Sequence, residues 1–174
     1  DLKAGWSNQD SDGSEQTFAL LTPVLLNPNG SDSAIGSQFR YTDGTGSHTL
    51  TYNGTPVRIP MAALDTVEFI ASNNVSGSFE IQVQALTIDT DPNGGAPVEA
   101  TSGSATLTNL VIAPVADPIT LAVSSPGVGN EDTPIALAIR PTSSDSSETF
   151  TVTIAGIPAG AQIHYGGVLQ TVSG

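Results

Sequence analysis

The chain has 174 residues, 17 of them acidic and 4 basic, so its formal net charge is -13 at pH 7. This balance argues against nucleic acid and anionic membrane surfaces as partners, because both repel negative charge. Cysteine is absent, which excludes disulfides, and no apolar run of about 18 residues predicts a membrane-spanning helix. Hydrophobic residues make up 38% of the chain, enough for a packed core. We expect a folded acidic protein with no membrane insertion.

Alternating polar and apolar residues predict short β-strands along the whole chain. The expected strands are Thr17–Leu26, Ser37–Thr42, His48–Tyr52, Val57–Ile59, Val67–Ile70, Phe79–Ile88, Ala105–Val115, Ile119–Val123, Ile135–Ile139, Thr149–Ile157, Ala161–Tyr165 and Val168–Val172. Only Pro60–Asp65 favours a helical turn, and it is too short for a stable helix. Clusters of Gly, Asn, Asp and Pro separate these segments, so we predict an all-β fold, a sandwich of antiparallel strands.

An internal repeat suggests two modules. Residues 11–18 resemble residues 144–150, with Asp12 aligned to Asp145 and Glu15 to Glu148. In both copies an apolar strand that ends in proline follows. The repeat therefore predicts that one kind of module occurs twice in the chain.

The expected module boundary lies in Ala113–Pro118, where two prolines flank an extended segment. We predict a first β-sandwich module at residues 1–117 and a second, incomplete one at residues 118–174. The second copy lacks counterparts of Val67–Ile70, Phe79–Ile88 and Ala105–Val115. About 55 residues bury too little apolar surface to offset chain entropy alone, so we expect residues 119–174 not to form an independent sandwich.

The order of motifs carries a resemblance to a family. Asn130–Leu137, a polar loop and then Thr151–Ala161 resemble the tandem modules of large bacterial repeats-in-toxin (RTX) adhesins. Pro60–Leu64, Gly77–Val83 and Val115–Pro118 are similar to the later half of such a module. The resemblance implies Ig-like or cadherin-like extender modules, stabilised by calcium, that space or present ligand-binding regions. It also implies an extracellular protein of the bacterial cell surface, exported by type I secretion and active in cell adhesion and biofilm formation.

Acidic residues in turns are the candidate calcium ligands, because Ca²⁺ takes six to eight oxygen ligands on a tightly turning backbone. Three groups are candidates: Asp10, Asp12 and Glu15; Asp89 and Asp91; and Asp117, Glu131 and Asp132. Each also has a simpler interpretation as a solvated polar turn. Asp145 and Glu148 are weaker candidates, because Asp-x-Asp-Gly in the first copy is Asp-Ser-Ser in the second.

Strand counting predicts where these acids lie. If seven strands alternate in direction through the first module, Asp10, Asp12 and Glu15 lie at the end where Asp117 follows. Asp89 and Asp91 then lie at the opposite end. The prediction depends on the count, since one strand more or fewer reverses it.

No enzyme is expected, because the chain lacks a Gly-x-Ser-x-Gly elbow, a phosphate-binding loop and a His-Glu-x-x-His motif. The leading hypothesis is a calcium-stabilised adhesin module whose partners are neighbouring modules of the same chain. One alternative is a recognition module in which Asn27–Pro56 binds a sugar or peptide of a host or microbial surface, with or without calcium. Another is a carbohydrate-binding accessory domain of a hydrolase, since sandwiches serve all three roles.

Overall fold

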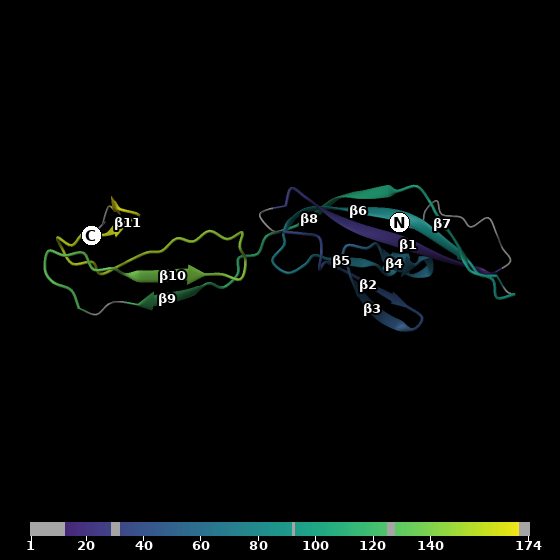
Figure 1. Ribbon diagram of the computed structural model, residues 1–174, viewed down its shortest axis with the longest axis horizontal. Coiled ribbons are helices and arrows are strands. Elements are labelled where there is room, and N and C mark those ends of the chain that lie inside the picture. The colour runs from purple at the N-terminus through teal and green to yellow at the C-terminus, as the bar shows by residue number, and fades with distance from the viewer. Residues whose placement is uncertain (1–12, 29–31, 92, 125–127, 171–174) are drawn as a thin grey trace. The chain divides into compact units, whose positions relative to one another are not determined.

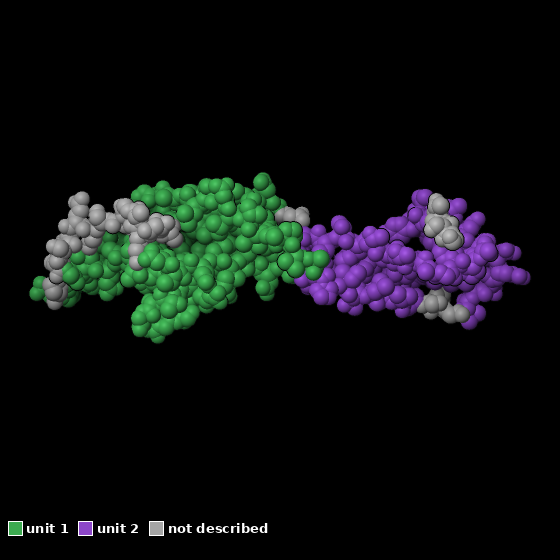
Figure 2. All heavy atoms as spheres, turned by 180° about the vertical axis from the view of Figure 1, so that it is seen from behind, with its two compact units in different colours: residues 1–116 green, residues 117–174 purple. Residues whose placement is uncertain are grey.

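The computed structural model describes residues 13–28, 32–91, 93–124 and 128–170. The chain divides into two compact units, Asp1–Ala116 and Asp117–Gly174, coloured separately in Figure 2. The described residues of both units form antiparallel strands, and their single helix is the short 3-10 helix η1, Met61–Thr66. The predicted all-β fold is therefore confirmed.

The larger sheet of unit 1 is centred on two long neighbouring strands, as Figure 1 shows. They pair antiparallel along their whole length, from Glu15 opposite Asp89 to Leu26 opposite Ser78. The sheet contains β1 (Glu15–Leu26), β4 (Val57–Pro60), β6 (Gly77–Asp89), β7 (Val98–Thr101) and β8 (Ala105–Ile112), in the order β4-β1-β6-β7, with β8 also on β6.

One edge of this sheet is a strand in two parts. β7 pairs with residues 86–89 of β6, and β8 pairs with residues 77–83. Between them the Ser102 N–H donates to the Ala85 carbonyl at 2.9 Å, and the Ala85 N–H donates to the Ser102 hydroxyl at 2.8 Å. A second irregularity shifts the register between Phe79 and Ile81. Such bulges bend an edge strand and hinder pairing with other chains.

The smaller sheet of unit 1 has the order β3-β2-β5 and is built from β2 (Gln38–Asp43), β3 (Gly46–Thr51) and β5 (Glu68–Ile70). The β2–β3 hairpin closes at Asp43 opposite Gly46, and Gly46 has φ 136°, which favours glycine. Helix η1 connects β4 of the larger sheet to β5 of the smaller one, so the chain passes between sheets here.

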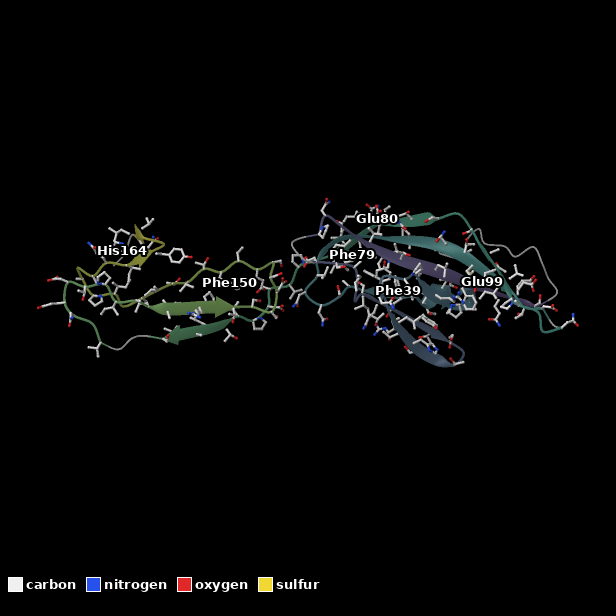
Figure 3. All side chains as sticks on the ribbon, viewed as in Figure 1. Phe39, Phe79, Glu80, Glu99, Phe150 and His164 are labelled. Atoms are coloured by element: carbon white, nitrogen blue, oxygen red, sulfur yellow. The ribbon has the colours of Figure 1, made fainter. Side chains whose placement is uncertain are left out.

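The core lies between the two sheets, in a sandwich-like arrangement. Its buried side chains are Ala19 and Leu21 of β1, Val57 and Ile59 of β4, Ile81 and Val83 of β6, Phe39 and Tyr41 of β2, and Ala63 and Leu64 of η1. Phe69 of β5 joins the sheets, with ring centroids 5.4 Å from Phe39 and 5.2 Å from Phe79. Figure 3 shows Phe39 and Phe79 inside this unit.

The described residues of unit 2 form two separate strand pairs. β9 (Thr120–Ser124) pairs with β10 (Ala138–Thr142), and β11 (His164–Tyr165) pairs with β12 (Val168–Leu169). None of its described residues is buried. Its larger apolar side chains keep much of their surface in solvent, for example 39% for Phe150 and 40% for Ile154.

The strand predictions succeed in unit 1 and fail in part of unit 2. The expected strand Thr149–Ile157 is wrong, because residues 149–157 form no strand, and the strand expected at Ile135–Ile139 is Ala138–Thr142. A strand needs a partner for its backbone groups, and the described part of unit 2 has no equivalent of β6 beside this segment. The edge strand β7 was not expected, since Val98–Thr101 is only four residues long.

Candidate functional site

The acids at the start of β1 and the end of β6 lie together. Glu15 is the register partner of Asp89. The Ser14 hydroxyl donates to Asp89 Oδ1 at 2.8 Å, and the Thr90 hydroxyl donates to the Ser14 carbonyl at 3.0 Å. The remaining candidates of this loop, Asp10 and Asp12, lie outside the described residues.

The expectation that Glu15 and Asp89 occupy opposite ends of the first module is therefore wrong. It depended on an assumed count of alternating strands. Six strands run from β1 to β6 in the structure, and an even number of alternating strands leaves the first and the last antiparallel. Because β1 and β6 are antiparallel neighbours, the first residue of one lies at the same end as the last residue of the other.

Asp91 forms a turn of its own. Its Oδ1 accepts the Asn93 N–H at 2.7 Å, and its carbonyl accepts the Gly94 N–H at 3.0 Å. This is the local side-chain turn expected of Asp in such a sequence. One carboxylate oxygen of Asp91 therefore accepts a hydrogen bond within its own turn, as expected if this segment is a solvated polar turn.

A second acidic cluster lies in unit 2, at its first residue. The Asp117 N–H donates to Glu148 Oε1 at 2.5 Å, and the Ser144 hydroxyl donates to Asp117 Oδ2 at 3.2 Å. These contacts bring together segments about 30 residues apart in sequence, 31 for Asp117 and Glu148. We call Asp117, Ser144 and Glu148 the entry cluster, since the chain enters unit 2 here.

The loop before Glu148 is ordered by its own hydrogen bonds. The Asp145 N–H donates to the Ser143 hydroxyl at 3.1 Å, and Asp145 Oδ1 accepts the Ser147 N–H at 2.7 Å. Hydrogen bonds from Ser147, first from its backbone N–H and then from its hydroxyl, lower the pKa of Asp145 below its usual value of 3.8. Asp145 is therefore ionised near neutral pH, which adds a negative charge to this loop.

One oxygen of the entry cluster has no hydrogen-bond partner among the residues that the structure describes. Glu148 Oε2 is buried, and no hydrogen bond to it is formed within the described part of the chain. A buried, unpaired carboxylate oxygen is costly, because it has given up water without compensation.

The ion pairs of the described residues lie elsewhere, at Arg40–Glu68, His48–Asp43 and Arg58–Glu99. Residues 117–174 contain one basic side chain against five acidic ones: Arg140 against Asp117, Glu131, Asp132, Asp145 and Glu148.

The structure does not bring Glu131 and Asp132 to Asp117. They belong to the connection at the end of the β9–β10 pair where Ser124 faces Ala138. Asp117 precedes the other end, where Thr120 faces Thr142. Among the residues that the structure describes, no three His, Asp or Glu side chains come together to hold a metal. The geometry therefore does not support the expected grouping of these three acids, and Asp117 is close to Glu148 instead.

Sequence reasoning placed Glu148 among the weaker candidates, whereas the structure brings it into contact with Asp117. Its signal was the repeat itself, which aligns Glu148 with Glu15. The loss of Asp-x-Asp-Gly in the second copy suggested that this loop had lost its ligands. The structure shows that a residue distant in sequence, Asp117, approaches the loop, which local spacing does not reveal.

The β2–β3 hairpin holds a further acid that the sequence did not single out as a site. Asp43 Oδ1 accepts the Thr45 hydroxyl at 2.7 Å and the Thr45 N–H at 2.8 Å, and His48 Nε2 lies 3.0 Å away. The Thr45 hydroxyl, the Thr45 N–H and His48, in that order, lower the pKa of Asp43 from 3.8 to about 2. This cluster closes the hairpin and is structural.

Comparison with protein-family models, curated proteins and solved structures finds no match to the chain. In the described residues, no helix has both the length and the apolar character to cross a membrane.

Proposed function

We propose that the chain carries calcium-stabilised β-sandwich modules, Ig-like or cadherin-like, of a large extracellular bacterial adhesin. In this role they space or present ligand-binding regions at the cell surface, with neighbouring modules of the same chain as partners. The observation that carries the proposal is the entry cluster, where the buried Glu148 Oε2 has no hydrogen-bond partner among the described residues.

The donor set of the entry cluster fits a hard cation. Calcium prefers carboxylate and other oxygen ligands, and waters complete its shell. Asp117 and Glu148 would supply carboxylates, and the Ser144 hydroxyl stabilises the Asp117 carboxylate. A cation also removes the repulsion between two carboxylates that no described basic side chain neutralises.

The position of the cluster gives binding a mechanical consequence. Asp117 directly follows Ala116, the last residue of unit 1. A cation held by Asp117 and Glu148 would fix the start of unit 2 to the loop at residues 143–148. A chain without cysteine has no disulfide to supply such a constraint. Stiffness at the start of a module is what a spacer requires.

The structure of Asn27–Pro56, the region considered for ligand binding, supports the spacer role. The described residues of Asn27–Pro56 provide β2 and β3, and Phe39 and Tyr41 from β2 are part of the core. This region therefore contributes the second layer of the first module. No described feature of it favours sugar or peptide binding over this structural role.

The test is thermal unfolding with calcium and with chelator, for the full chain and two variants. Glu148→Gln removes the unpartnered charge of the entry cluster. Glu131→Gln makes the same change at the opposite end of the β9–β10 pair and is the matched control. At a hundredfold excess over its dissociation constant, calcium should stabilise the folded chain by about 2.7 kcal/mol. Glu148→Gln should lose most of this gain, and Glu131→Gln should keep it. Superimposable melts of the unchanged chain would sink the proposal.

A further inference from the structure

Three Asn-Gly pairs occur in the chain, at Asn29, Asn53 and Asn93. Glycine after asparagine leaves the backbone nitrogen open to attack the side-chain amide, because no Cβ shields it. Asn29 lies outside the described residues, so Asn53 and Asn93 can be compared.

At Asn53 the amide oxygen is held by two donors. Asn53 Oδ1 accepts the Thr55 hydroxyl at 2.6 Å and the Thr55 N–H at 3.1 Å. Residues 53–55 are exposed, and a Cβ built at Gly54 would meet no atom within 4 Å. The Gly54 N–H has no hydrogen-bond acceptor within the described part of the chain. The nitrogen is therefore accessible, and the amide carbonyl is polarised.

At Asn93 the same dipeptide has the opposite surroundings. The Gly94 N–H is engaged, since it donates to the Asp91 carbonyl at 3.0 Å. The Asp91 carboxylate accepts the Asn93 N–H at 2.7 Å, which places a negative charge beside the pair. That charge opposes the removal of a proton from the Gly94 nitrogen and the build-up of negative charge on the amide oxygen.

We propose that Asn53 is a deamidation site whose reaction the fold promotes through Thr55. The Gly54 nitrogen loses its proton to solvent and forms a bond to Asn53 Cγ, and negative charge develops on Oδ1. The two Thr55 donors stabilise that charge, as backbone N–H groups do in an oxyanion hole. The side-chain nitrogen then takes up a proton from solvent, its bond to Cγ breaks, the Oδ1 carbonyl re-forms and ammonia leaves. Water opens the resulting succinimide to aspartate or isoaspartate.

The product alters the connection between the two sheets. One negative charge is added, and the isoaspartate form lengthens the backbone by one carbon. Residue 53 lies between β3 and β4, four residues before the buried Val57, which is the first residue of β4. The modification therefore changes the connection that leads into a core-forming strand of the larger sheet.

The test is peptide mapping by mass spectrometry after incubation of the full chain at mildly alkaline pH. In the folded chain, Asn53 should deamidate at least about threefold faster than Asn93. In urea the two rates should become equal. Thr55→Val keeps the shape of the side chain and removes its hydroxyl donor. It should slow conversion at Asn53 about two- to tenfold and leave Asn93 unchanged.

A second variant tests the nucleophile. Gly54→Ala should slow conversion at Asn53 in both folded and unfolded chains, because the added methyl hinders the nitrogen. Equal rates at Asn53 and Asn93 in the folded chain would overturn the proposal. So would an unchanged or faster reaction at Asn53 in Thr55→Val, since the hydroxyl would then restrain the amide rather than activate it.

Discussion

The two units have similar alternating sequence patterns, but their apolar side chains are buried to different degrees. In unit 1, Leu21 of β1 is 1% exposed and Ile59 of β4 is fully buried. In unit 2, Val152 and Ile154 keep about 40% of their surface in solvent, at 41% and 40%. The segments that contain Leu21 and Ile154 follow the two copies of the repeat, so local sequence alone does not set their burial.

The difference between the units is the central strand. β1 is extended over twelve residues because β6 pairs with every one of them and β4 covers its other edge. Residues 149–157 have an alternating pattern, and no strand of the described residues pairs with them. An alternating pattern therefore predicts the capacity for a strand, and the partner decides whether it forms.

The largest expected effect comes from removing a core aromatic side chain of unit 1. Phe79→Ala should lower the free energy of unfolding of that unit by about 3–5 kcal/mol, because Phe79 is fully buried. Phe150→Ala in unit 2 should cost about 1 kcal/mol or less, since its side chain remains partly in water. Denaturant titration of both variants measures the contrast. Equal losses would mean that Phe150 is packed as well as Phe79.

A buried polar group provides a second contrast. Ser37 is fully buried, and its hydroxyl accepts the Ser72 N–H at 3.2 Å. Ser37→Ala should destabilise the chain by about 1–3 kcal/mol, because it leaves a backbone donor without an acceptor. The matched change, Ser143→Ala in unit 2, removes the acceptor of the Asp145 N–H in a partly exposed loop, and should stay within about 0.5 kcal/mol. Chemical denaturation compares them, and a larger loss at Ser143 would reverse the comparison.

The sequence predicted the strands that have a neighbouring strand to pair with. It did not predict features that depend on contacts between residues far apart in the chain. Alternation placed Thr17–Leu26 and Phe79–Ile88 close to β1 and β6, because both strands are long and β-branched or apolar on the inner face. It failed for Thr149–Ile157, where the alternating pattern is present but no neighbouring strand of the described residues pairs with it.

For the candidate site it proposed Asp117, which is the first residue of unit 2. It grouped Asp117 with Glu131 and Asp132, because spacing in sequence does not show which end of a strand pair a loop occupies.

A smaller effect is expected on the outer face of the larger sheet. The Arg58 guanidinium lies 5.3 Å from the centroid of the Phe18 ring and 3.4 Å from Glu99 Oε1. Both contacts are partly exposed, so Arg58→Gln should destabilise unit 1 by about 0.5–1 kcal/mol. High salt should weaken only the ion-pair part. Thermal melts at low and high salt check this, and a loss of several kcal/mol would imply a contact beyond these two.

The smallest effect is a pH dependence at the β2–β3 hairpin. The pKa of Asp43 is lowered from 3.8 to about 2 in the folded chain. Its contribution to stability is therefore complete above pH 3.8 and is lost as the pH falls toward 2. Asp43→Asn should remove this part of the acid dependence and leave the profile above pH 4 unchanged. Acid titrations of hairpin amide signals would measure it. Identical profiles for the two chains would contradict the assigned hydrogen bonds.

Hydrogen exchange of the full chain, read by mass spectrometry with calcium and with chelator, tests the central claim most directly. We expect β1 and β6 to be strongly protected in both conditions. Residues 143–148 should exchange quickly in chelator and gain protection when calcium is added, and Glu148→Gln should abolish that gain. Protection of unit 2 in chelator equal to that of unit 1 would contradict the contrast between the units. Exchange at residues 143–148 that calcium leaves unchanged would contradict the assigned role of the entry cluster.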